Sequence, residues 1–177
     1  KRTFLVLKKR CIMNYISIIP ETSVDGEGLR TSIYVTGCKH HCKGCHNPES
    51  WSFGGGYQYD ASTKKKILDI IKLPYIKGLT LSGGDPLENI NIVELIDLCK
   101  EVHKLGKDIW LYTGYRWEDV NTNKEKLSLI NEVDVLVDGP YIESLRDTTN
   151  NNKFRGSTNQ HIVRVSIFRD TLNKLSK

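Results

Sequence analysis

Three cysteines in one short segment constrain this chain more than any other feature of its sequence. Cys38, Cys42 and Cys45 lie in the stretch GCKHHCKGCHNP with the spacing C-x3-C-x2-C. Thiolates on one irregular loop can bind a common inorganic cluster, each at a different corner. Three such ligands would hold three irons of a 4Fe-4S cluster and leave the fourth iron open to a further ligand.

A zinc site is an alternative for the same segment. A tetrahedral zinc ion accepts three cysteines and one histidine, and His40, His41 or His46 could supply that histidine. Such sites usually combine two separated pairs of ligands, whereas all candidates here lie within nine residues, which favours the cluster. Thiols without any metal are a third possibility, in which case the histidines are ordinary loop residues. For His40 and His41 we favour a solvated position.

The other cysteines do not extend this motif. Five cysteines are an odd number, and three of them are crowded together, unlike the disulfide framework of a secreted domain. Cys99 falls on the apolar face of a predicted helix and is expected in the core, and Cys11 belongs to a basic N-terminal segment. We therefore expect a cytoplasmic protein whose thiols stay reduced.

Short β-branched runs alternate with amphipathic patterns and predict an α/β fold. Strands are expected at 31–36, 78–82, 108–113, 133–138 and 161–166. Helices are expected at about 62–73, 91–106 and 124–131. Asn91 would cap the start of the second helix and Gly106 its end. This order suits a mostly parallel sheet of about five strands, too few for an eight-stranded barrel, and we predict an open, partial (β/α) barrel.

Unusual loops follow three of the predicted strands, at the edge of the sheet where ligands of parallel α/β folds bind. The cysteine loop follows the first strand, GGDP the second and GYRW the third. Gly83 and Gly84 would let the backbone approach a ligand without a Cβ in the way, although a tight strand-to-helix turn would use the same residues. The polar, Asn-rich stretch 147–160 is expected to form a long loop.

The net charge of +5 does not indicate a nucleic-acid partner. The first twelve residues contain no acid but several bases, namely Lys1, Arg2, Lys8, Lys9 and Arg10. Of the 26 basic residues, 21 therefore lie beyond this segment, against 21 acidic ones, so the rest of the chain is neutral overall. A phosphate-binding footprint belongs on a folded surface rather than in one short end.

A length of 177 residues suits one domain with one hydrophobic core. We expect residues 13–177 to form that domain. Residues 1–12 precede the only methionine of the chain, Met13, and are expected to be a non-native or disordered extension. No stretch approaches the roughly 18 apolar residues that a membrane span requires, so no membrane partner is expected.

The cysteine spacing resembles the signature of the radical S-adenosylmethionine (SAM) superfamily, and LSGGDP is similar to its glycine-rich motif. The resemblance implies one 4Fe-4S cluster on the three cysteines, with SAM as the ligand of the open iron. It also implies SAM contacts from Gly83, Gly84 and Asp85, where the superfamily often has glutamate at the position of Asp85.

One departure from the superfamily pattern concerns the residue before the third cysteine. The superfamily commonly has an aromatic residue there, which packs on adenine, whereas this chain has Gly44. The resemblance therefore implies that the backbone from Gly44 through Cys45 to His46 makes the adenine contact instead.

Further motifs resemble one family of this superfamily, the activating proteins of anaerobic (class III) ribonucleotide reductases. The match runs from Met13 to about Val165 and includes VDGEGLR, CHNPESW, LSGGDPL, WLYTGY, DVLVDGPYI and FRGSTNQ. It implies that an electron donor such as a flavodoxin or ferredoxin reduces the cluster and that SAM is cleaved to methionine and a 5'-deoxyadenosyl radical. This radical would remove a hydrogen atom from a glycine in the C-terminal region of the reductase large subunit.

The remaining motif residues have plainer interpretations beside functional ones. VDGEGLR resembles the D-G-x-G-x-R segment of glycyl-radical-enzyme activating proteins, which implies that Asp25 and Arg30 face the substrate, although a glycine turn before a strand would use the same pattern. The run from Trp110 to Tyr112 is expected to pack as a strand. Arg155 could anchor the partner, bind SAM or lie in a solvated loop.

Two other functions are consistent with these motifs. The same chemistry could act on another glycyl radical enzyme, such as pyruvate formate-lyase. Alternatively, the chain could be a zinc-stabilised binding module without turnover, although such a module would not need the glycine pair 83–84 at the carboxyl end of a strand.

Overall fold

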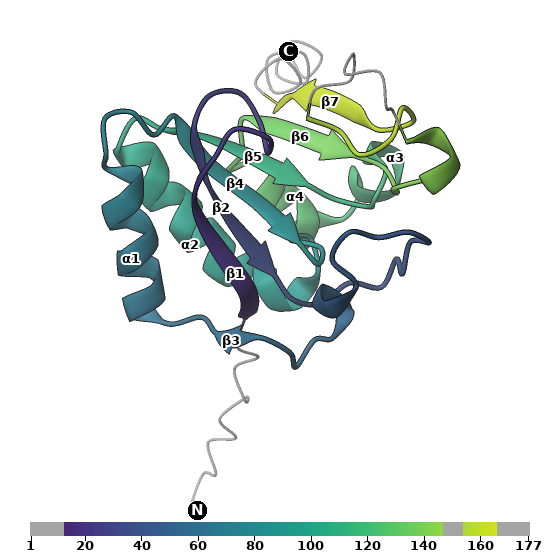
Figure 1. Cartoon of the computed structure of the whole chain (residues 1–177), viewed down its shortest axis with the longest axis horizontal. Coiled ribbons are helices and arrows are strands. Elements are labelled where there is room, and N and C mark those ends of the chain that lie inside the picture. Colours follow the sequence, from purple (N-terminus) through teal and green to yellow (C-terminus); the bar gives the residue numbers. More distant parts are fainter. Residues whose placement is uncertain (1–12, 147–153, 166–177) are drawn as a thin grey trace, which may run out of the picture.

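The structure of the chain is a computed structural model that describes residues 13–146 and 154–165 (Figure 1). Within these ranges, seven strands form one sheet in the order β3-β1-β2-β4-β5-β6-β7. The strands are β1 Asn14–Thr22, β2 Arg30–Val35, β3 Tyr57–Gln58, β4 Gly78–Gly83, β5 Asp108–Tyr112, β6 Val135–Asp138 and β7 His161–Arg164. The helices are α1 Ala61–Ile71, α2 Asn89–Lys104, α3 Trp117–Val120 and α4 Lys124–Ile130, with 3-10 turns η1 Pro48–Trp51 and η2 Glu143–Leu145.

The centre of the sheet is parallel and its edges are antiparallel. β2 pairs with β4, β4 with β5 and β5 with β6 in parallel. The five strands expected from the sequence correspond to β2, β4, β5, β6 and β7. β7 runs antiparallel to β6, however, and β1 and β3 add two antiparallel strands at the opposite edge. In the described part of the chain the sheet therefore has more strands than expected, and more of them are antiparallel. Its closure into a partial barrel stays a prediction.

β1 is absent from the expectations because its sequence, NYISIIPET, does not alternate regularly and contains Pro20. The structure accommodates both features near the edge of the sheet. β1 pairs with β2 on one side and with the two-residue β3 on the other, and its register shifts between Tyr15 and Ser17 and again between Ile19 and Thr22. Proline, which lacks an N–H, is tolerated at such bulges and edges.

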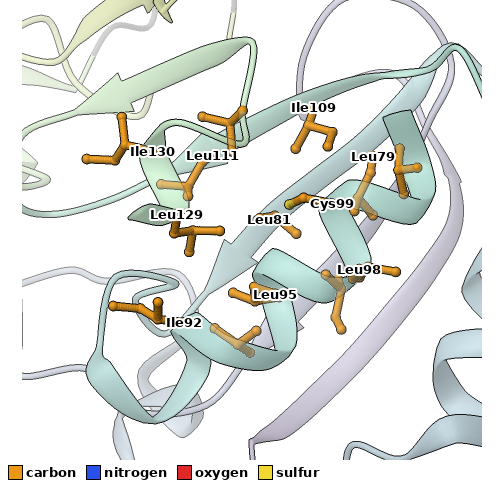
Figure 2. Close-up of a cluster of buried hydrophobic side chains, with 14 of the residues drawn as sticks. Leu79, Leu81, Ile92, Leu95, Leu98, Cys99, Ile109, Leu111, Leu129 and Ile130 are labelled. Atoms are coloured by element: carbon orange, nitrogen blue, oxygen red, sulfur yellow. The ribbon is translucent and has the colours of Figure 1, made fainter. Parts of the chain in front are cut away.

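Helices α1, α2 and α4 lie side by side on one face of the sheet (Figure 1). Alternate strand residues point toward these helices, as the two-residue period of a strand requires. In Figure 2, Leu79 and Leu81 from β4 and Ile109 and Leu111 from β5 face Leu95, Leu98 and Cys99 of α2, and all of these side chains are fully buried. The expectation that Cys99 is a core thiol is confirmed.

The intervening strand residues point to the opposite face of the sheet. There Trp110 packs with Val135 and Val137, and its ring centroid lies 5.5 Å from that of Phe154. Trp110 and Leu111 are therefore packed strand residues, as expected. Tyr112, at the carboxyl end of β5, is only half-buried and belongs to the cavity wall described below.

Asn91 is not the cap of α2. The helix begins at Asn89, and the fully buried side chain of Asn91 lies in its first turn. Its amide donates to the carbonyl oxygen of Thr36 at 3.1 Å and to that of Asp85 at 3.0 Å, so it links the loops that follow β2 and β4. Gly106 does follow the helix end with a φ of +70°, as expected.

The described ranges contain no helix with both the length and the apolar character of a membrane span. Residues 1–12, with Cys11, lie outside the described residues, as does 147–153 of the predicted long loop. The described remainder of that loop, 154–160, has no helix or strand and leads into β7.

Candidate functional site

The three motif cysteines lie on the loop that leaves the carboxyl end of β2, and all three line one cavity of about 400 Å³. This loop is tied to the segment around η1. The Gly37 N–H donates to the Ser50 carbonyl oxygen at 2.8 Å, and the Cys38 N–H donates to that of Trp51 at 3.2 Å. The fold thus brings the predicted ligands to one wall.

Backbone N–H groups influence all three sulfurs. Burial raises the pKa of the Cys38 thiol to about 11, and the N–H groups of His40 and His41 oppose this rise. Burial likewise raises the pKa of Cys42, opposed by the N–H of Tyr141. The Asn47 N–H donates to the Cys45 sulfur at 3.4 Å.

These thiols have the environment that iron–sulfur ligands require. A buried thiol stays protonated at neutral pH unless a positive charge stabilises the thiolate, and bound iron supplies such a charge. Backbone N–H groups directed at sulfur stabilise the thiolate further and help to set the reduction potential of a cluster. The donor set therefore fits a 4Fe-4S cluster.

The zinc alternative fits the arrangement less well. Within the described ranges, no three His, Cys, Asp or Glu side chains are grouped so as to hold a single metal ion, whereas cluster thiolates each bind a different iron. The His40 ring nitrogen Nε2 is already 2.9 Å from Asp85. The exposed His41 packs edge-on against Trp51, with ring centroids 4.7 Å apart.

The glycine loop after β4 forms the adjacent wall of the cavity. Gly83, with a φ of +102°, and Gly84 both line it. The Gly84 N–H donates to the Val35 carbonyl oxygen at 2.8 Å, and the Asp85 N–H donates to that of Gly37 at 2.8 Å. The two loops thus meet backbone to backbone, and both interpretations of the glycine pair, close approach and tight turn, apply.

Gly84→Ala is expected to lower the free energy of unfolding by about 1–3 kcal/mol, the usual cost of overpacking. A Cβ at Gly84 would lie 2.6 Å from the carbonyl oxygen of Gly37, so one of the two loops must move. Urea unfolding measures the change. Gly54→Ala is the matched control, because no heavy atom lies within 4 Å of its added Cβ. Equal urea midpoints for both variants would contradict the close contact.

Asp85 and Gly44 are two of the residues that the resemblance expects to contact SAM. The cavity wall, as far as the structure describes it, includes neither residue. Asp85 is fully buried, and both of its carboxylate oxygens are engaged by protein groups. Gly44, with a φ of +72°, faces Glu143, whose carboxylate would lie 2.6 Å from an added Cβ. The expected contacts of these two residues with SAM are thus not reflected in the cavity wall.

His46 and Cys45 do line the cavity, and Tyr141 from the loop after β6 lies beside them. The ring centroids of His46 and Tyr141 are 5.5 Å apart. No motif in the sequence indicates a role for Tyr141, although its position after a predicted strand, at the carboxyl edge of the sheet, is a signal for a ligand-binding residue. It supplies an aromatic ring near the third cysteine.

Asp25 and Arg30 of VDGEGLR lie in different surroundings. Asp25 lines the cavity, and one of its carboxylate oxygens accepts hydrogen bonds from the hydroxyls of Ser32 and Tyr34, each at 2.8 Å. Arg30 is fully buried and forms an ion pair with Asp108 at 2.6 Å. The expectation that Arg30 faces the substrate is therefore wrong in this structure.

Arg155 also lines the cavity, where its guanidinium donates to the Gln160 carbonyl oxygen at 2.9 Å. It is half-buried, so the solvated-loop interpretation does not describe it. Arg155 instead places a positive charge on the cavity wall.

Comparisons with known proteins decide the family. A family model described as a 4Fe-4S single cluster domain matches residues 24–163. An anaerobic ribonucleoside-triphosphate reductase-activating protein from Haemophilus influenzae is 39% identical over 159 residues, which are 88% of this chain and 100% of the relative. Relatives of the same name from Enterobacteria phage T4 and Escherichia coli (strain K12) are 40% and 34% identical over 152 residues, or 85% and 84% of this chain and 93% and 96% of theirs.

The chain belongs to the anaerobic ribonucleoside-triphosphate reductase-activating protein family. The segment matched by the iron–sulfur model contains every described residue of the cavity wall, from Val24 to Gln160. In this family member, the site built from the geometry and the region assigned by comparison are therefore the same part of the chain.

Proposed function

We propose that this chain activates an anaerobic ribonucleoside-triphosphate reductase by cleaving SAM reductively at a 4Fe-4S cluster and removing a hydrogen atom from a glycine of the reductase. One observation carries the proposal: the three cysteines and the glycine pair 83–84 line the same cavity. The names of the relatives supply the partner. The iron–sulfur family match supplies the cluster.

The chain's own residues would hold and orient the two cofactors. Cys38, Cys42 and Cys45 would bind three irons. Because the N–H groups of Gly84 and Asp85 already donate to the carbonyl oxygens of Val35 and Gly37, the carbonyl groups of the glycine loop are the natural acceptors for the ammonium of SAM. Tyr141 and His46 would border the adenine. The cavity would hold SAM close to the cluster and keep water away from the reacting groups.

When bound and reduced by one electron from a flavodoxin or ferredoxin, the cluster supplies the electron that cleaves SAM. The products would be methionine and the 5'-deoxyadenosyl radical, which takes a hydrogen atom from the glycine Cα and becomes 5'-deoxyadenosine. The chain itself needs no general base for this step, because a hydrogen atom moves rather than a proton. We further propose a cytoplasmic location, where thiols stay reduced.

Anaerobic reconstitution tests this function. We expect the protein to bind about four irons and four sulfides, as a single cubane requires, and to form 5'-deoxyadenosine from SAM with a reductant. Electron paramagnetic resonance should then show a glycyl radical on the reductase, and pyruvate formate-lyase serves as the comparison partner. Stoichiometric zinc without sulfide would contradict the enzyme and favour a zinc-stabilised binding module. A radical on pyruvate formate-lyase alone would contradict the partner.

A further inference from the structure

Asp85 is a fully buried carboxylate between the cysteine loop and the ends of β4 and β5. Its Oδ1 accepts the Leu87 N–H at 2.9 Å, and its Oδ2 accepts the Gly114 N–H at 3.0 Å. The Thr113 hydroxyl lies 3.0 and 2.9 Å from the two oxygens. Nε2 of His40 is 2.9 Å from Oδ2. One side chain thus joins three loops.

Three donors converge on this carboxyl group. The N–H groups of Leu87 and Gly114 can only donate. The Thr113 hydroxyl already accepts the N–H of Tyr115 at 3.1 Å, so its own proton is free to point at Asp85. Nε2 of His40 donates to this carboxyl group in one tautomer and accepts in the other. The three donors therefore stabilise a negative charge on a side chain that has no contact with solvent.

This charge lies next to the cysteine ligands. The Asp85 N–H binds the carbonyl oxygen of Gly37, the residue before Cys38. His40, its side-chain partner, lies between Cys38 and Cys42 in the loop. Besides burial, which is the main cause, the charge of Asp85 raises the pKa of both thiols. Its field therefore acts on two of the three ligands.

We propose that the Asp85 carboxylate lowers the reduction potential of the 4Fe-4S cluster, with His40 as the positioning residue that holds the cysteine loop against it. Reduction adds a negative charge to the cluster, and a fixed negative charge nearby, poorly screened by solvent, makes that addition less favourable. The electron enters from the external donor and leaves to the substrate, while Asp85 exchanges no proton. The proposal rests on the presence of the cluster in the proposed function.

A redox titration of the reconstituted full-length protein without SAM tests the proposal, with the reduced cluster followed by electron paramagnetic resonance. At a fixed potential, Asp85→Asn is expected to raise the ratio of reduced to oxidised cluster by at least about tenfold, an upward shift of about 59 mV for a one-electron couple. Asp85→Glu keeps the charge and is expected to stay close to the wild type.

Asp134→Asn is the matched control. Asp134 also meets a histidine nitrogen, that of His103 at 3.0 Å, and a backbone N–H, that of Ile109 at 2.8 Å. It lies just before β6, at the opposite end of the parallel strands from the cavity, so the potential should not move. An equal upward shift in this variant would overturn the proposal, because removing any carboxylate would then suffice.

An Asp85→Asn protein with full iron and sulfide content and the wild-type potential would also overturn the proposal, while the cluster and the proposed function would stand. Failure of the wild type to bind iron would instead refute the proposed function. If Asp85→Asn does not bind the cluster, the reduction potential of Thr113→Val tests the proposal instead. This variant keeps the Asp85 carboxylate and removes a hydrogen-bond donor that offsets its negative charge. A downward shift in this variant supports the proposal, and an unchanged potential overturns it.

Discussion

Cys42→Ala is expected to purify without a 4Fe-4S cluster and to form no 5'-deoxyadenosine from SAM. The Cys42 thiol lines the cavity and is the middle one of the three ligands in sequence, and the Tyr141 N–H opposes the rise of its pKa. Two remaining thiolates cannot bind three irons, and the loss removes the electron source as well. Iron and sulfide analysis, visible absorption and 5'-deoxyadenosine formation measure the result.

Cys99→Ala is the matched control for this prediction. It makes the same chemical change at a fully buried thiol on α2, whose pKa burial raises far above its ordinary value. We expect full iron and sulfide content with some loss of stability, because the change leaves a small cavity in the core. Retention of cluster and SAM cleavage by Cys42→Ala would show that the ligands are misassigned. Loss of the cluster in Cys99→Ala would show that core packing, not ligation, was measured.

The sequence could place the cysteine loop and the glycine loop on one edge because of a general property of parallel strands. Residues 31–36 and 78–82 were recognisable as neighbouring strands, and the carboxyl ends of parallel strands meet at the same edge. The structure bears this out, since Cys38 and Gly83 line one cavity. The antiparallel edge strands β1 and β3 follow no such rule, because the pairing of short, irregular strands depends on partners far away in the sequence.

The contacts between side chains could not be predicted from the sequence. His40 was expected in solvent, yet its side chain is only 20% exposed and lies against Asp85 and the ring of Tyr115, whose centroid is 4.5 Å away. The residues in contact are separated by 45 and more positions. A residue type near a motif does not reveal whether it faces the ligand or supports the loop that does. Asp25 and Arg30 are five positions apart, yet Asp25 lines the cavity whereas Arg30 is buried and supports the sheet.

Arg30→Met is expected to lower the free energy of unfolding by about 3–5 kcal/mol, as the loss of one partner from a buried ion pair usually does. The Arg30 guanidinium donates to the Thr80 hydroxyl at 2.9 Å and to the Leu79 carbonyl oxygen at 2.8 Å, besides its contact with Asp108. Burial lowers the pKa of Arg30, and Asp108 opposes that shift. Methionine fills much of the space but satisfies none of these acceptors. Urea unfolding measures the loss.

Arg164→Met is the control, because it removes an arginine from an exposed ion pair with Glu27 at 3.3 Å, in which both side chains are 58% exposed. Such surface changes usually stay within about 0.5 kcal/mol. The comparison separates the two roles that VDGEGLR allows for Arg30. If Arg30 faced the substrate, its replacement would impair activation of the reductase and leave the urea midpoint unchanged. If Arg30 instead links β2 to β4 and β5, its replacement must lower the urea midpoint. Wild-type stability of Arg30→Met would contradict this structural role and favour a role in substrate contact.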